Sequence, residues 1–200
     1  MRTIKYNFLL LLAALLLLNI ANLQAQRVKV KLENQHIQQF IQIWGLIKYK
    51  SQKSINGEFD ADSVFLTMAD SVKNANKAQF NRLMLKLTSA VDDSLTALAQ
   101  GNYRDTLNSY HHLLKNVDYS WIRDQSFTNA LKKQLMTLSN QVNLSGKHQY
   151  IPSVWYESDL PHEFSYPNDD FKEEKMNLLA LAKAWNAIAY LFPYKYMTDK

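Results

Sequence analysis

The chain has 200 residues, with 23 basic and 18 acidic side chains, a formal net charge of +5 and no cysteine. The lack of cysteine excludes a disulfide framework and a thiol nucleophile, and it removes the commonest zinc ligand. Only four glycines are present. This argues against an all-β chain, a Rossmann domain and a P-loop protein, because those folds use glycine repeatedly for positive φ and for close approach to phosphates.

The first 25 residues have the pattern of a cleavable secretory signal peptide. Arg2 and Lys5 form a basic start, and residues 8–18 are an uninterrupted run of 11 apolar residues. Such a run is shorter than the roughly 20 apolar residues that a membrane span needs. A small residue, Ala25, precedes the expected cleavage before Gln26. We therefore expect export to the periplasm, cell envelope or medium; the alternative is an uncleaved N-terminal anchor.

Cleavage would also change the charge of the chain. Residues 1–25 contain two basic and no acidic side chains, so the net charge falls from +5 to +3. That value is ordinary, and with export it gives no reason to expect a nucleic-acid partner. The 175 residues that stay are enough for a sizeable core, and none of their segments predicts a stable membrane span.

The mature chain is predicted to be mainly α, with a helical domain over residues 26–146. A basic-apolar alternation at 27–32 predicts one short strand before it. All four prolines lie after residue 150, so the domain has no strong breaker. Apolar residues at spacings of three and four predict helices over about 37–49, 60–72, 77–99 and 127–142, with a less regular one over 107–114.

Turn and cap residues separate these helices. Residues 50–57 are a polar connector that ends in an Asn56-Gly57 turn signal, and Gly101-Asn102 suits a left-handed C-terminal cap. Side chains that can cap a helix N-terminus precede two of the helices: Asp60 or Asp62 before the second, and Asp124 or Ser126 before the last.

The pattern changes near residue 147. Residues 148–156 are rich in aromatic and branched side chains and predict a strand, which Pro152 would make an edge or a bulge. An acidic linker with two prolines follows up to residue 170. Residues 171–200 then begin a second helical region and stop without a polar tail, as if the chain were cut within a domain. The apolar stripe expected on its helix is Met176, Leu179, Ala180, Ala184, Ile188 and Leu191.

Two segments of the chain resemble each other. Residues 40–49 align with residues 181–190 at an offset of 141, and they share Trp, Ile and Tyr as W-x-x-I-x-Y. Convergence of two amphipathic helices is one explanation, since one repeat at this distance is not a solenoid period. A shared family pattern is the other.

Both segments resemble parts of one protein family. The stretch IWGLIKY with FDAD at 59–62 is similar to the W-G-x-x-K-Y…F-D-W-D segment of bacterial serine peptidases of family S41, the C-terminal-processing or tricorn-like group. Residues 178–200 resemble a second such segment, W-N-x-I-x-Y-x-F-P-Y-K-Y, of the long exported members. The pieces V-D-x-x-W-I at 117–122 and G-K-H-x-Y-I at 146–151 occur in the same order, as does an acidic Tyr-Pro linker at 166–170. The chain departs from the pattern at Ser51-Gln52, where His-Pro is expected, and at Ala61, where Trp is expected.

The resemblance implies peptide hydrolysis by a serine nucleophile with a lysine base, in a catalytic domain beyond Lys200. None of that domain's motifs occurs in these 200 residues, and neither Ser-x-x-Lys nor G-x-S-x-G is found. We therefore expect no catalytic residue, no cofactor and no metal site here. His111-His112 are neighbours that point apart on a helix, which predicts a solvated or packed pair and no metal site. His162-Glu163 lacks the H-E-x-x-H spacing and predicts surface residues.

The aromatic residues allow one binding hypothesis. Trp44 and Trp185 lie on apolar stripes, which favours packing in the core. Trp155 and Tyr156, on the predicted edge strand, are the candidate peptide contacts, because an edge strand can add an extended peptide. The sequence thus predicts the non-catalytic N-terminal portion of an S41-like serine peptidase, with peptide or protein substrate engaged through downstream domains. The alternative is a stand-alone periplasmic helical module that binds a peptide or protein.

Overall fold

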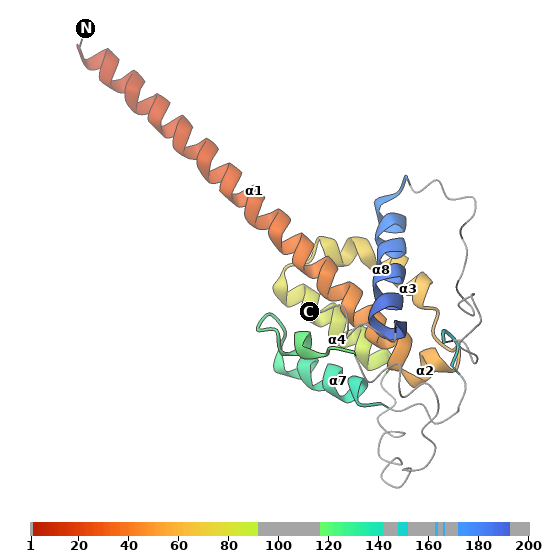
Figure 1. Cartoon of the computed structure of the whole chain (residues 1–200). Helices are drawn as coiled ribbons and strands as arrows, with labels where there is room; N and C mark the ends of the chain where they lie inside the picture. Colours follow the sequence, from red (N-terminus) through yellow and green to blue (C-terminus); the bar gives the residue numbers. More distant parts are fainter. Residues whose placement is uncertain are drawn as a thin grey trace.

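The protein is mainly α-helical, as the sequence predicts (Figure 1). The computed structural model describes residues 2–91, 117–141, 148–151, 163, 166 and 172–192, with side chains for Asn19 and from Asn22 onward. Within these ranges the elements are α1 (Arg2–Lys50), α2 (Gln52–Ile55), α3 (Ala61–Lys73), α4 (Lys77–Ala90), the 3₁₀ helix η2 (Ser120–Arg123), α7 (Asn129–Ser139) and α8 (Glu174–Leu191).

Helix α1 is the centre of the fold. Its C-terminal part contacts α2, α3, α4, α7 and α8, and from His36 onward most of its side chains are buried. The N-terminal part projects from the body (Figure 1), with residues 22–31 exposed. The strand expected at 27–32 is wrong: these residues continue α1. No neighbouring strand pairs with them in the described structure, and a helix satisfies its backbone hydrogen bonds internally.

The helices predicted over 60–72 and from residue 77 are confirmed, and their caps explain where they begin. Asp60 accepts a hydrogen bond from the Ser63 backbone N–H at the start of α3. Asn76 and Gln79 form a reciprocal capping box at the start of α4. The polar connector contains a short helix, α2, and then turns at Gly57, whose φ of 80° favours glycine.

Helix α7 begins two residues later than the predicted caps suggest. Asp124 accepts a hydrogen bond from the Ser126 N–H within a turn, and Thr128 is the residue that caps α7, through the Leu131 N–H. The expected stripe of this helix is buried at Phe127, Leu131, Leu135 and Leu138. Residues 92–116 and 142–147, with the predicted helix over 107–114 and the Gly101-Asn102 cap, lie outside the described residues.

The predicted strand at 148–156 is wrong where it can be compared. Residues 148–151 form a turn, and the backbone N–H of Gln149 donates to the Ile55 carbonyl of α2 instead of to a strand. The His148 ring also fixes this turn, because it hydrogen-bonds the Tyr49 carbonyl and the Tyr150 N–H. Residues 152–162 lie outside the described residues.

Helix α8 packs against α1 and α3 in the same core. The domain boundary near residue 170 stays a prediction. The helix is confirmed, but half of its predicted apolar stripe is wrong: Ala180, Ala184 and Ile188 are exposed. Its buried residues are Met176, Leu179, Ala182, Asn186 and Tyr190. Among the residues described here, no helix combines the length and apolarity that crossing a membrane requires.

Candidate functional site

The two W-x-x-I-x-Y segments pack against each other where α1 meets α8. Asn186 is 1% exposed, and its side-chain Nδ2 donates to the backbone carbonyls of Ile41 at 3.0 Å and Ala182 at 2.9 Å. One turn further along, the rings of Tyr49 and Tyr190 stack with centroids 4.9 Å apart. These contacts hold the two helices in a close parallel arrangement.

The packing pairs equivalent positions of the repeat. Gly45 meets Asn186, and Tyr49 meets Tyr190, each pair separated by the same offset of 141 residues. A Cβ atom on Gly45 would lie 1.8 Å from the Asn186 Oδ1 atom, so only glycine permits this approach. The two segments are therefore direct neighbours in the fold, and each covers part of the other.

Lys48 follows on the same helix, and its side chain is fully buried. Its Nζ atom lies 4.9 Å from the centroid of the Trp44 ring and 4.5 Å from that of Tyr150, and it contacts the Glu163 carboxylate directly. Burial lowers the pKa of the Lys48 ammonium, and the nearby Glu163 charge only partly offsets this. Sequence reasoning missed this site, although the K of the W-G-x-x-K-Y pattern is Lys48.

Glu163 joins Lys48 to a second lysine, and the four side chains Lys48, Glu163, Lys183 and Asp62 form the buried ionic cluster. The Lys183 Nζ atom lies 2.9 Å from Glu163 Oε2 and 2.8 Å from Asp62 Oδ2. Burial alone would raise the pKa of the Glu163 carboxyl, but the two ammonium groups outweigh it and hold this pKa below its ordinary value. Tyr166 adds a hydrogen bond, 3.1 Å long, from its hydroxyl to Asp62.

The buried ionic cluster joins α1, α3 and α8 to the segment of Glu163, and its groups are already paired with one another. Every charged group of the buried ionic cluster faces an opposite charge, so none is poised as a free base. The nearby Ser54 hydroxyl donates to the Lys48 carbonyl, and the Ser51 hydroxyl caps α2. The prediction that Glu163 lies on the surface is wrong: only 15% of its side chain is exposed, because two lysines hold it inside.

A separate groove lies between α1 and α8. Its volume is about 430 Å³, and Ile37, Ile41, Leu178, Leu181 and Trp185 supply its apolar lining. Asn34, Gln38 and Gln42 of α1 complete the wall, and no charged residue lines it. Core packing is confirmed for Trp44, which is 0% exposed and donates to the Ala61 carbonyl. It is wrong for Trp185, which is 57% exposed because the Asn186 side of α8 faces the core instead.

The other residues singled out in the sequence cannot be placed. Trp155 and Tyr156, His111-His112 and His162 lie outside the described residues. In the described part of the chain, no three His, Asp or Glu side chains gather closely enough to hold a metal ion.

Comparison of the chain with protein-family models, with curated proteins and with solved structures finds no match.

Proposed function

We propose that this chain is the non-catalytic N-terminal region of an exported serine peptidase similar to family S41. The observation that carries the proposal is the contact between the two segments that resemble that family, with Gly45 against Asn186 and Tyr49 against Tyr190. Residues of both motifs make structural contacts. In the first motif, Lys48 contacts Glu163 and Trp44 donates to the Ala61 carbonyl. In the second, Asn186 donates to the Ile41 carbonyl of α1. Such roles account for why residues of these types stand at these positions.

Export is part of the proposal. The leader would end at Ala25, among the exposed residues 22–31 of α1. The first buried side chain that the structure describes is His36. Removal of residues 1–25 would thus leave the described core intact.

Peptide hydrolysis is assigned to residues beyond Lys200. A serine–lysine site needs a neutral lysine next to the serine hydroxyl that it activates. Lys48, the most deeply buried lysine of the described residues, contacts the Glu163 carboxylate instead. The chain on its own is therefore expected to leave peptide bonds intact.

The reading frame downstream of Lys200 tests this proposal. We expect it to continue into a PDZ-like segment and a catalytic domain with serine and lysine motifs. A stop codon at this point with no such remnant beyond it would refute the proposal. As a second test, the purified mature chain should not cleave casein, and turnover sensitive to serine-protease inhibitors would contradict the assignment of the chemistry.

The groove favours a second candidate function, a helical module that binds a peptide or protein. Large apolar side chains on the surface of α8 support it: Leu181, Trp185 and Ile188 are each more than half exposed. A patch of this kind on a folded protein commonly marks an interaction site. A titration of the mature chain with labelled peptides tests this function, and an absence of saturable binding would contradict it.

A further inference from the structure

We propose that the groove between α1 and α8 binds an uncharged peptide in an extended conformation. This inference rests on the binding role proposed above and names its ligand. The floor of the groove is apolar. It is formed by Ile37 and Ile41 of α1 and by Leu178, Leu181 and Trp185 of α8. The exposed indole of Trp185 and the neighbouring Leu181 provide a surface for one apolar side chain of the peptide.

Three carboxamide side chains of α1 also line the groove, those of Asn34, Gln38 and Gln42. They recur every four residues, which corresponds to about 6 Å along a helix. A peptide extended as a β-strand repeats every two residues, or about 6.4–6.8 Å. The carboxamides therefore match the backbone groups that an extended chain turns to one side, and their flexible side chains can absorb the small difference.

The same carboxamides decide between an extended peptide and a docked helix. Each carboxamide offers both a donor and an acceptor, and an extended backbone needs partners of both kinds. A helix satisfies its own backbone internally, so it would cover these groups without bonding them, at an energetic cost. Asn34 and Gln38 are exposed and Gln42 is half-buried, and among the described residues the side chains of these three form no hydrogen bond.

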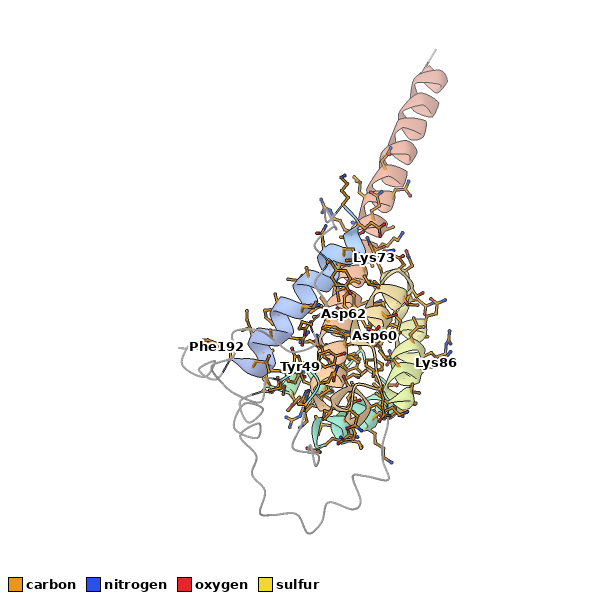
Figure 2. All side chains as sticks on the ribbon, turned by 90° about the vertical axis from the view of Figure 1, so that its right-hand side faces the viewer. Tyr49, Asp60, Asp62, Lys73, Lys86 and Phe192 are labelled. Carbon is orange, nitrogen blue, oxygen red and sulfur yellow. The ribbon has the colours of Figure 1, made fainter. Side chains whose placement is uncertain are left out.

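Charge complementarity adds the second property of the ligand. The wall and floor contain no Asp, Glu, Lys or Arg, so a charged peptide side chain would lose hydration without gaining an opposite charge. The exposed apolar face continues along α8 through Ile188 to Phe192, and Figure 2 shows Phe192 at the end of this helix, on the opposite side of the molecule from Lys86. We infer a ligand with uncharged side chains, apolar at alternate positions.

The test uses two blocked peptides that carry the uncharged nitrobenzoxadiazole fluorophore, and the mature chain purified after export. One peptide is extended, with the sequence Ser-Leu-Thr-Val-Ser-Leu-Thr; the other has the same apolar residues in a helix fixed by aminoisobutyrate. We expect saturable binding of the extended peptide that changes less than twofold between low and high salt. The paired substitution Gln38→Leu and Gln42→Leu should weaken its binding about tenfold, and Trp185→Ala should do the same.

Matched controls separate the groove from general effects. Gln35→Leu lies on the same helix but not in the groove, and Met136→Ala removes an exposed apolar side chain from α7; neither should change binding. Tighter binding of the helical peptide would overturn the inference while leaving the binding role in place. If neither peptide binds, the inference fails; the binding role fails as well only if the peptide titration described above also gives no saturable binding. A dimer in sedimentation that Trp185→Ala abolishes would also overturn the inference, because a second copy would then occupy the groove.

Discussion

Gly45 and Asn186 are in direct contact where α1 meets α8, and each depends on the other. A Cβ atom at Gly45 would lie 1.8 Å from Oδ1 and 2.2 Å from Cγ of Asn186. The Asn186 side chain cannot easily yield, because it is buried and bonds the carbonyls of both helices. We predict that Gly45→Ala lowers the free energy of unfolding by on the order of 2 kcal/mol, although alanine favours a helix over glycine. Urea denaturation measures the effect.

The control places the same substitution in an Asn186→Ala background. There the obstacle is gone, and the helix preference of alanine should make Gly45→Ala neutral or stabilising by up to about 1 kcal/mol. An equal loss of stability in both backgrounds would show that the close approach is not the cause.

The effects of substituting Lys48 and Glu163 on the free energy of unfolding should not be additive, because the two side chains are in contact. Glu163→Gln leaves the Lys48 ammonium buried beside a neutral partner, and such a broken ion pair typically costs about 3–5 kcal/mol. Replacing both residues, Lys48→Met with Glu163→Gln, should cost less, because methionine suits the surrounding aromatic rings. Thermal and urea unfolding of the two variants give the comparison. A double variant less stable than Glu163→Gln alone would contradict the coupling.

The buried His148 should make the free energy of unfolding fall in acid. Burial lowers its pKa to about 4 from an ordinary value of 6.5, and the folded ring stays neutral because Nδ1 accepts the Tyr150 N–H. Below pH 6.5 the unfolded chain binds a proton that the folded chain does not. The free energy of unfolding should therefore fall between pH 6.5 and about 4, by on the order of 3 kcal/mol, and then level off.

Denaturation at several pH values measures this slope. His148→Gln keeps a donor for the Tyr49 carbonyl but cannot titrate, so its slope should be shallower by one proton in the same window. His36, whose pKa burial also lowers, adds a smaller dependence of the same sign in both proteins. Identical slopes for the two proteins would rule out His148 as the main source.

Asn81 should contribute to the free energy of unfolding, because its side chain links α4 to the residues just before α7. It is buried, its Nδ2 donates to the carbonyls of Lys77 and Ser126, and its Oδ1 accepts the Thr128 N–H at 2.7 Å. Asn81→Leu keeps the volume but leaves backbone groups unpaired, so it should lower the free energy of unfolding by about 2–3 kcal/mol. Asn81→Asp retains the acceptor for the Thr128 N–H but turns an ionised oxygen toward the Lys77 and Ser126 carbonyls, so at pH 7 it should cost at least as much in urea denaturation. A clearly smaller loss for Asn81→Asp would contradict the role of the two bonds that Nδ2 donates.

The helices could be predicted because their apolar residues recur at a helical period. Phe65 and Val72 of α3 are buried as expected, as are Phe80 and Met84 of α4. The orientation of α8 could not be predicted, because apolar residues lie on almost every side of it. The buried side carries Asn186, which packs against Gly45, and periodicity does not reveal a contact between residues so far apart in the sequence.

The buried ionic cluster was beyond sequence reasoning for a different reason. Lys48 and Glu163 are 115 residues apart, and Asp62 and Lys183 are 121 residues apart. Hydropathy assigns each of these side chains to the surface, and only the folded chain shows that they neutralise one another. The groove escapes prediction for another reason, since the periodicity of α8 assigns Trp185 to the core although it is exposed.

If this chain is, as we propose, the N-terminal region of an exported peptidase, it should occur within a longer secreted polypeptide. The most direct measurement is a peptide map, with the N-terminal sequence, of the endogenous protein isolated with an antibody against residues 26–200. We predict an N-terminus at Gln26 and one continuous polypeptide that also contains a serine–lysine catalytic domain. A mature protein that ends at Lys200, or one that retains residues 1–25 in the cytoplasm, would contradict the account.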